Sequence, residues 1–432
     1  MMDKVKNNKL LLSITSLGSA TILNATLAFL IGIITRNILG PERHGFWLNV
    51  SILFTFVPIF QLGTLNAMNR EIPFFSIRRE KEKVEKIKKL VFSFIFTLPF
   101  AITLLLTGVS ILLFIFGIRY EISLGLLFAS VISFFTFFSN YIEMMYKSEQ
   151  DFQKASRLIS LRSITQSLFT VMCVYWFGYF GLYVGMLSAF LIQILAARKA
   201  FPKVKSIKIG SPLKLEEYKT LIRIGFPIML VGLVWGIMVA TDRMIITALM
   251  SPIDLGNYGV GLLVFSSVML FPAVVNQVLY PKIVEQVSCE NYRKVRSFFW
   301  KTNGILASVM LLVVVIGYIV LPGFVSFAMP EFVPGVRAAQ ILLMGVYPLT
   351  LVGVAAGFFN ATNNQKGYLL IQVVSIVFNI ILSLTMLRFR FTIETVALAT
   401  SISFVLYMFL MNGYFLYILR EKYILLEPYQ AE

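Results

Sequence analysis

Long apolar runs, separated by short polar segments, recur along the whole chain. The first two, Leu11–Thr35 and Trp47–Met68, flank a short segment that contains Gly40, Pro41 and Gly45. Each run is long enough to cross the ~30 Å hydrocarbon core of a bilayer as a helix. Because glycine and proline together favour a tight turn, the pattern predicts a hairpin of two membrane helices at the start of the chain.

The same pattern predicts twelve transmembrane helices in all. Their approximate ranges are 11–35, 46–69, 90–116, 122–145, 158–178, 180–197, 224–249, 256–279, 303–327, 337–360, 367–387 and 394–418. The alternating segments of about ten residues that are typical of a membrane β-barrel do not occur. We therefore expect an all-α integral membrane protein.

Composition and charge agree with this class. Of the 432 residues, 58% are hydrophobic and 14% are charged, against about 25% charged in soluble domains. Loops on the side of the termini carry 30 Lys and Arg residues, and loops on the other side carry 6. Since Lys and Arg collect in cytoplasmic loops, we expect both termini in the cytoplasm and the protein in the cell (inner) membrane. This asymmetry explains the net charge of +17 without a nucleic-acid partner.

Two loops carry most of the positive charge. Arg70–Lys89 predicts a short amphipathic or solvated helix, which either lies on anionic headgroups or only fixes the topology. Arg198–Arg223 is rich in Pro, Gly and Lys and lies at the middle of the chain, as a linker would. The expected domains are a six-helix lobe (1–197), a cytoplasmic basic linker (198–223) and a second six-helix lobe (224–432).

Several classes of chemistry have no sequence support. No loop is long enough for a soluble catalytic domain, and the GxxxxGK[ST] phosphate-binding motif is absent. Cys173 and Cys289 have no metal-binding spacing, and the single histidine, His44, is expected in the first turn. We therefore predict no enzyme activity, no metal and no cofactor.

Short motifs recur at a nearly constant offset and indicate an internal duplication. The pairs are Pro41 and Pro252, Gln153 and Gln365, and Pro58 and Pro272, with offsets of 211, 212 and 214 residues. Six helices per unit is an even number, so both units have one orientation and a pseudo-two-fold axis along the membrane normal is expected. Pro58, Pro227, Pro272 and Pro348 lie inside predicted helices and favour bends.

These features carry a resemblance to a known family. Ile38-Leu39-Gly40-Pro41-x-x-x-Gly45 is echoed by Leu249-x-x-Pro252-x-x-x-Gly256, and with six plus six helices it resembles the multidrug/oligosaccharidyl-lipid/polysaccharide exporter superfamily. Within it, the chain is similar to the polysaccharide-transport branch, the O-antigen (Wzx-type) flippases. The resemblance implies movement of a polyprenyl-pyrophosphate-linked oligosaccharide to the outer leaflet by alternating access between two lobes. Helix one has no charge before Arg36, unlike the lipid-II flippase branch.

An anionic head group inside a membrane protein needs cations, and arginine suits a pyrophosphate. Arg243, beside Asp242, lies about 10 Å from the outer end of its helix at ~1.5 Å per residue; it either meets substrate or snorkels outward. Arg162 is expected just inside helix five, facing either a cavity or the cytoplasm. Arg70 is either an entrance residue or an ordinary interface anchor.

Uncharged polar residues near the midplane complete the candidate substrate path. They are Asn24, Gln166 and Asn379, and each either contacts sugar hydroxyls or joins helices at about 1 kcal/mol. Asp242 is the candidate ion-coupling residue because, without an ATP motif, a proton or sodium gradient is an available driving force.

Other functions stay open on the sequence alone. An ion-coupled multidrug exporter of the same superfamily would need an apolar, aromatic and acidic site. A membrane-embedded polysaccharide polymerase or ligase would have one large outer loop, and the outer loops here are short. A third hypothesis is that the protein is a scaffold in a cell-wall assembly complex and transports nothing. The expected partners are a lipid-linked anionic oligosaccharide, membrane lipids and polysaccharide-assembly proteins, with the protein itself a monomer.

Overall fold

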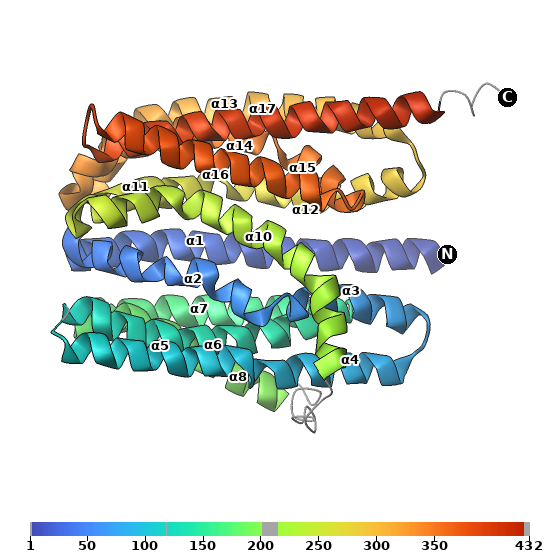
Figure 1. Ribbon diagram of the computed structural model, residues 1–432, viewed down its shortest axis with the longest axis horizontal. Coiled ribbons are helices and arrows are strands. Elements are labelled where there is room, and N and C mark those ends of the chain that lie inside the picture. The colour runs from blue at the N-terminus through green and yellow to red at the C-terminus, as the bar shows by residue number, and fades with distance from the viewer. Residues whose placement is uncertain (1, 118, 201–214, 427–432) are drawn as a thin grey trace. The chain divides into compact units, whose positions relative to one another are not determined.

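The computed structural model describes residues 2–117, 119–200 and 215–426, and all regular structure in these ranges is helical. The elements are α1 (Met2–Ser51), α2 (Leu53–Phe56), η1 (Val57–Gln61), α3 (Thr64–Ile77), α4 (Lys81–Ile95), α5 (Leu98–Ile115), α6 (Tyr120–Ser148), α7 (Phe152–Phe177), η2 (Gly178–Phe180), α8 (Gly181–Ala200), α10 (Leu215–Leu249), α11 (Pro252–Val268), α12 (Leu270–Ser288), α13 (Tyr292–Ala328), η3 (Pro330–Gly335), α14 (Val336–Thr350), α15 (Gly353–Ala361), α16 (Gln365–Leu387) and α17 (Ile393–Leu426). Every predicted range falls on these elements (Figure 1), which confirms the all-α prediction.

Ten helical stretches of the described chain are long and apolar enough to cross a membrane. Two of them, Ile22–Gln61 and Phe152–Lys199, contain 40 and 48 residues. At ~1.5 Å per residue each would be roughly twice the ~30 Å hydrocarbon core. Each therefore contains two crossings, and the reversals fall at Gly40 (φ 69°) and Gly178 (φ 54°). With ψ of 174° and −129°, these conformations are open to glycine and strained for other residues. Gly40 alone makes the first reversal, and Gly178 begins the short η2 that makes the second.

The second predicted helix, 46–69, is broken, which the sequence pattern missed. The chain passes from α2 through η1, and then Leu62 (φ 48°) and Gly63 (φ 80°) adopt left-handed conformations before α3 begins. Pro58 lies at the start of η1. Proline has no N–H and its ring clashes with the preceding turn, which explains why the α-helix stops here.

The other in-helix prolines occupy comparable places, with one exception. Pro272 lies in the first turn of α12, directly after the end of α11. Pro348 lies in the last turn of α14, before the break that precedes α15. Pro227 lies inside α10, which continues through it. Pro58 and Pro272, paired by the sequence repeat, thus both mark a break in the second membrane segment of their half.

Backbone geometry repeats at the same offset as the sequence motifs. Arg79 and Glu290 have φ of 59° and 54° and lie 211 residues apart. Gln150 and Asn363 have φ of 61° and 56° and lie 213 residues apart. Such angles are uncommon for residues other than glycine. Four positions that recur in pairs therefore support the internal duplication independently of residue identity.

The hydrogen bonds around these turns recur as well. The Glu80 amide donates to Phe75 O over 3.0 Å, and the Asn291 amide donates to Gln286 O over 2.9 Å. Bonds of this kind cap the free carbonyl groups at the end of a helix. The turns between α3 and α4 and between α12 and α13 are therefore the same structure built from different side chains.

The chain divides into two compact units, Met1–Leu233 (unit 1) and Val234–Glu432 (unit 2). The division lies inside α10, whereas the predicted linker is 198–223. Most of that linker, residues 201–214, lies outside the described residues. The predicted lobe boundaries therefore stay a prediction.

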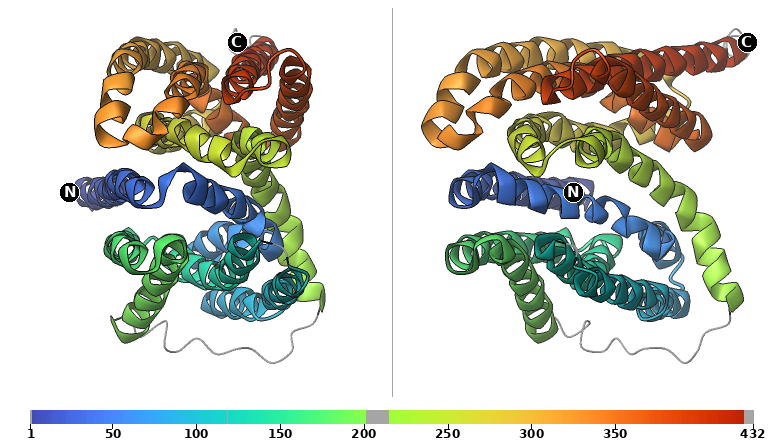
Figure 2. Two further views of the ribbon diagram at one scale, coloured as in Figure 1. Left: turned by 90° about the vertical axis from the view of Figure 1, so that its left-hand side faces the viewer. Right: turned by 60° about the vertical axis from the view of Figure 1, so that its left-hand side comes forward.

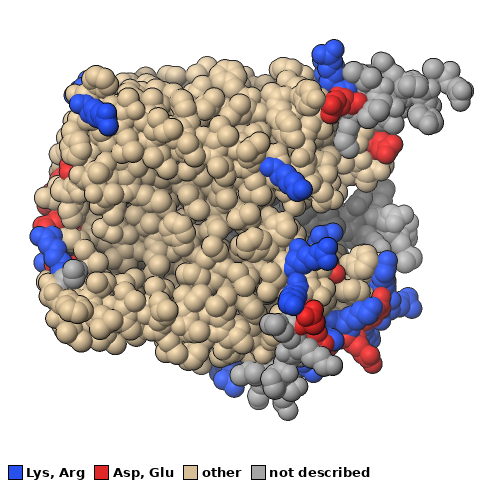
Figure 3. Space-filling model, in the orientation of Figure 1, with Lys and Arg blue, Asp and Glu red and all other residues tan. Residues whose placement is uncertain are grey.

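Charge in unit 1 gathers at the ends of its helices. Figure 3 shows Lys, Arg, Asp and Glu side chains collected around α3 and α4, while the flank of this unit is mostly uncharged. Lys88 of α4 is buried and its Nζ lies 2.5 Å from Glu149 Oε1 and 2.7 Å from Glu85 Oε1. Lys86 pairs with Glu217 of α10 at 2.7 Å. The basic segment around residue 80 is thus helical and fixed to the rest of its unit.

His44 lies in helix rather than in the predicted turn, and it is buried. The turn is shorter than the sequence suggested because Gly40 alone supplies it.

We predict that Gly225→Ala destabilises the protein. A Cβ at Gly225 would collide with the backbone of Gly63, where the first hairpin touches α10. Overpacking of this kind costs about 1–3 kcal/mol, and it is measured as a lower unfolding temperature in detergent. Gly232→Ala, on the same helix but with nothing within 4 Å of the new Cβ, is the control. Equal melting of the two variants would contradict the close contact.

Candidate functional site

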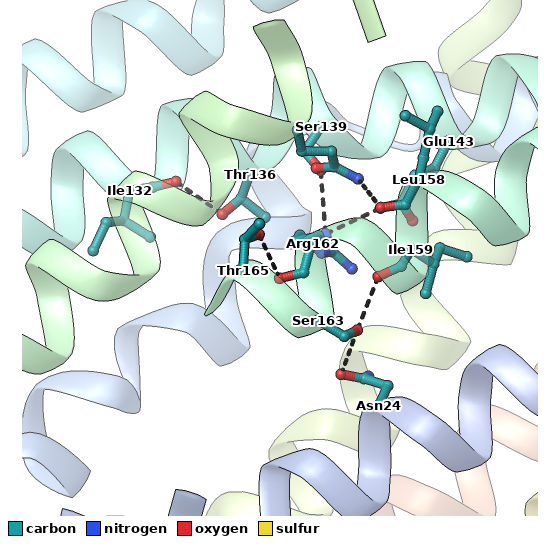
Figure 4. Close-up of polar contacts among 11 residues, drawn as sticks. Asn24, Ile132, Thr136, Ser139, Glu143, Leu158, Ile159, Arg162, Ser163 and Thr165 are labelled. Carbon is teal, nitrogen blue, oxygen red and sulfur yellow. Dashed lines mark hydrogen bonds and ion pairs between the residues drawn. The ribbon is translucent and has the colours of Figure 1, made fainter. Parts of the chain in front are cut away.

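Arg162 of α7 is held inside unit 1 by side chains of α6. Its Nη1 lies 3.2 Å from Glu143 Oε1 and donates to the Ser139 hydroxyl over 3.2 Å. Arg162 lies ten residues after the start of α7, or about 15 Å along the helix at ~1.5 Å per residue. Figure 4 shows the guanidinium pointing toward Ser139 and Glu143. Its side chain is 21% exposed, against 7% for Glu143, so part of the guanidinium stays accessible.

Gln193 of α8 completes this cluster. Its Nε2 donates to Glu143 Oε1 over 2.9 Å and to Leu158 O over 3.1 Å, and its Oε1 accepts from the Ser139 hydroxyl over 2.5 Å. The Arg162 guanidinium also lies 5.5 Å from the centre of the Phe190 ring, within the range of a cation–π interaction. A buried carboxylate needs such partners, and α7 and α8 supply those of Glu143.

Asn24 of α1 approaches the same part of α7. Its Oδ1 accepts a hydrogen bond of 2.8 Å from the hydroxyl of Ser163, the residue after Arg162 (Figure 4). Asn24 itself is exposed. Gln166 is half-buried one turn beyond Arg162 on the same face of α7. The structure thus places Asn24 next to the turn of α7 that carries Arg162, and Gln166 one turn further along α7.

A second cluster in unit 2 is centred on Asp242 of α10. The carboxylate is 3% exposed, and its Oδ2 accepts a hydrogen bond of 2.5 Å from the Tyr258 hydroxyl of α11. Its Oδ1 accepts from the backbone N–H of Arg243 over 2.6 Å. These two donors offset part of the cost of burying a negative charge.

Tyr258 also connects Asp242 to a second predicted residue, Asn379. Its hydroxyl lies in hydrogen-bonding range of Thr400 on α17. Thr400 Oγ1 accepts from Asn379 Nδ2 over 3.4 Å, and Asn379 Oδ1 accepts from the Ser383 hydroxyl over 3.0 Å. Asn379 is fully buried, so in this structure it joins α16 to α17 and faces no open surface.

The remaining two predicted residues do not join a cluster through their side chains. Arg243 is half-buried beside Asp242, and its Nε has no hydrogen-bond partner among the described residues. Arg70 is 60% exposed, and its Nε lies 3.9 Å from Glu71 Oε1. Arg70 therefore has the surroundings of an interface anchor, one of the two roles expected for it.

Seven polar residues of the two clusters were not predicted as members of a site: Ser139, Glu143, Ser163, Gln193, Tyr258, Ser383 and Thr400. Two signals for them exist in the sequence. Ser139 and Glu143, and likewise Asn379 and Ser383, are four residues apart and so share a helix face. Gln193 is a single amide in an otherwise apolar helix. Tyr258, however, lies sixteen residues from Asp242, and only the packing of α10 against α11 reveals that pair.

A family model described as "Polysaccharide biosynthesis protein" matches residues 10–287. The chain belongs to this family. No curated protein matches it by sequence.

The fold of the chain is similar to that of several solved structures. The chain resembles the inward-facing conformation of a multidrug resistance MATE family transporter of the MOP superfamily, with a TM-score of 0.77, 15% identity, and 93% of this chain and 98% of that chain covered. The outward-facing conformation of such a transporter gives a TM-score of 0.67 at 16% identity, with 95% and 96% covered. A MATE structure in complex with MaD3S gives 0.70 at 15% identity, with 95% and 96% covered.

The likenesses show the fold of these exporters, which agrees with the suspected superfamily, and the ten apolar helices agree with a multi-pass membrane protein. The neighbours have twelve transmembrane helices in two lobes, which agrees with the predicted helix number. At these identities the neighbours show the fold, and they leave the transported molecule open.

We predict that Glu143→Ala destabilises unit 1. The change leaves the Arg162 guanidinium without its carboxylate in a largely buried position, and loss of one partner of a buried ion pair costs about 3 kcal/mol. Unfolding temperatures in detergent measure the effect. The double variant Glu143→Ala/Arg162→Ala should lose less than the sum of the two single variants, because the two groups interact.

Glu42→Ala is the matched control. Glu42 pairs with Arg119 at 3.8 Å, but both side chains are exposed, so its loss should leave the unfolding temperature unchanged. Strict additivity of the Glu143 and Arg162 variants would argue against the buried pair.

Proposed function

We propose that the protein is a flippase. It moves a polyprenyl-pyrophosphate-linked oligosaccharide from the cytoplasmic to the outer leaflet by alternating access between two lobes, for surface polysaccharide biosynthesis of the O-antigen type. Membership of the polysaccharide biosynthesis family and the exporter fold support a transporter in this process. The observation that carries the substrate class is the partly accessible guanidinium of Arg162 inside the membrane-spanning part of unit 1.

The geometry around Arg162 suits an anionic head group. Both of its polar contacts, to Glu143 and Ser139, use the single atom Nη1. The guanidinium has five N–H donors. Glu143 and Ser139 fix its position, and the other N–H groups are free to bind phosphate oxygens. Asn24 bonds Ser163, the residue after Arg162, and Gln166 lies one turn further along α7; the amide groups of both can bind sugar hydroxyls.

The multidrug alternative rests on the fold of the neighbours and on one side chain. Asp242 is a buried carboxylate, and an acidic site would suit cationic compounds. Its carboxylate oxygens, however, already accept from Tyr258 and from the Arg243 amide. We therefore assign Asp242 to energy coupling, as the carrier of a proton or a sodium ion, and assign the substrate to Arg162.

The orientation and partners of this flippase follow from the charge pattern. With 30 Lys and Arg on the side of the termini against 6 on the other, we propose cytoplasmic termini in the inner membrane. The partners are membrane lipids, the lipid-linked oligosaccharide and polysaccharide-assembly proteins. A monomer is sufficient, because two lobes can enclose a site between them.

We predict that Arg162→Ala lowers the transport rate of a labelled polyprenyl-pyrophosphate oligosaccharide in proteoliposomes at least tenfold. Arg162→Lys should be slower than wild type but faster than Arg162→Ala, since lysine keeps the charge and loses the fork. Arg119→Ala removes an exposed arginine outside both clusters and serves as control. Normal transport by Arg162→Ala would remove the substrate site. Transport of lipophilic cations but not of oligosaccharide by the wild type would favour the multidrug function.

We predict that Asp242→Asn abolishes the acceleration of transport by an imposed proton or sodium gradient. The amide cannot carry a proton or balance a cation, whereas exchange without a gradient should persist. Asp254→Asn, which changes a half-buried helix-capping residue outside both clusters, should respond to the gradient as wild type does. Full gradient dependence in Asp242→Asn would show that coupling occurs elsewhere.

A further inference from the structure

A continuous polar face runs along α16 and is turned into unit 2. Its members recur every three or four residues and all are buried: Tyr368, Gln372, Ser375, Asn379 and Ser383. The opposite face is apolar and exposed, with Leu370, Val373, Val377 and Ile381. This is the reverse of a helix in a soluble protein, and polar residues inside a membrane bundle are candidates for ion or proton paths.

The neighbouring helix α17 supplies partners at intervals of seven residues. Thr400 accepts from Asn379, the Tyr407 hydroxyl faces Gln372 and Tyr368, and Asn364 Nδ2 donates to Tyr414 over 3.2 Å. Figures 1 and 2 show α16 and α17 side by side along their length. We call these three levels the polar seam.

The polar seam extends over much of a bilayer. From Thr400 to Tyr414 it covers fourteen residues of α17, or about 21 Å at ~1.5 Å per residue, against a hydrocarbon core of ~30 Å. At one end, Thr400 reaches Asp242 through Tyr258. At the other end, Tyr414 meets Asn364 in the turn between α15 and α16. The seam therefore connects the buried carboxylate with one end of unit 2.

At the middle level the Tyr407 hydroxyl lies within range of Tyr368 and Gln372, but no hydrogen bond there has good geometry. Gln372 is 0% exposed, and neither atom of its amide makes a hydrogen bond of good geometry with any described residue. The same is true of the Tyr407 hydroxyl. Buried polar groups without protein partners are commonly satisfied by internal water.

A role in joining helices does not by itself explain why Gln372 and Tyr407 lack good hydrogen bonds. A buried glutamine in unit 1 shows what such a role looks like. Gln193 is buried to a similar degree, and its amide makes three hydrogen bonds, to Ser139, Glu143 and Leu158. That amide joins helices. Gln372 and Tyr407 present similar chemistry and face each other, but neither makes a bond of comparable geometry.

We propose that the polar seam holds a file of water molecules that conducts protons between Asp242 and the end of unit 2 at the α15–α16 turn. The proposal rests on the coupling role proposed for Asp242 and makes the coupling ion a proton. In each step a hydroxyl or water accepts one proton on one side and releases another on the other side, so no net charge stays on Tyr407. The Gln372 amide orients water by donating from Nε2 and accepting at Oε1.

The groups that face Asp242 are compatible with this role. Its own helix supplies Arg243, α11 supplies Tyr258, and Thr400 of α17 lies beyond Tyr258. Arg243 is the charged group among them.

The test is hydrogen–deuterium exchange of the Asp242 carboxyl group in the purified full-length protein. Infrared spectroscopy follows the protonated carboxyl band after transfer to D₂O, and Asp242→Asn assigns that band. Tyr407→Phe and Gln372→Leu should slow exchange at least tenfold, because each removes polar atoms from the middle level. Tyr417→Phe and Gln340→Leu are the matched controls. Tyr417 bonds Glu421, and Gln340 bonds Tyr318 O of α13.

Exchange rates within twofold of wild type in both seam variants would overturn the proposal. So would the absence of an Asp242 carboxyl band in the wild-type protein at every pH at which it stays folded. Tyr407→Phe nearly conserves the side-chain volume. It therefore keeps the test valid if Gln372→Leu fails to fold. The assay contains no lipid-linked substrate. A failure of the flippase function would leave its result intact, and a failure here would leave oligosaccharide transport intact.

Discussion

Hydrocarbon offers no hydrogen bonds, and the rest of this structure depends on that constraint. Backbone groups in a membrane can be satisfied only within helices or closed β-barrels, and in the described part of this chain helices do so. A small polar side chain such as Thr103 can bond a carbonyl group of its own helix, but a buried charged group needs a partner on another helix. Arg162 finds Glu143, and Asp242 finds Tyr258. These few bonds determine which faces of the helices turn inward, while the many apolar side chains fill the space between them.

Equivalent aromatic residues make different contacts in the two halves of the chain. The aromatic residue of the repeated turn motif is Trp47 in the first half and Tyr258 in the second. Trp47 packs against the ring of Tyr183 at 4.9 Å, whereas Tyr258 donates to Asp242. The duplication therefore preserved the location of a large ring and changed its chemistry. The charged cluster of unit 1 suits an anionic substrate, and the neutral seam of unit 2 suits a proton.

Much of the fold could be predicted because the bilayer sets the length and polarity of each helix. Arg162, Asn24 and Gln166 could be selected for the same reason, since polar residues are rare in apolar runs. The break at Leu62 and Gly63 could not, because membrane helices often tolerate a proline such as Pro58. Nor could the pairing of Asp242 with Asn379 through Tyr258 and Thr400. That pairing depends on the rotation of α10, α11, α16 and α17 about their axes, which no local pattern encodes.

The left-handed turns at Arg79, Gln150, Glu290 and Asn363 bear on how such a protein diverges. Each turn is held by backbone hydrogen bonds, and its side chain is free to change from arginine to glutamate or from glutamine to asparagine. A duplicated gene can therefore lose nearly all similarity between its halves while both copies keep folding to one plan. In this chain the two halves have kept the φ angles of these turns, although the residues at the turns differ.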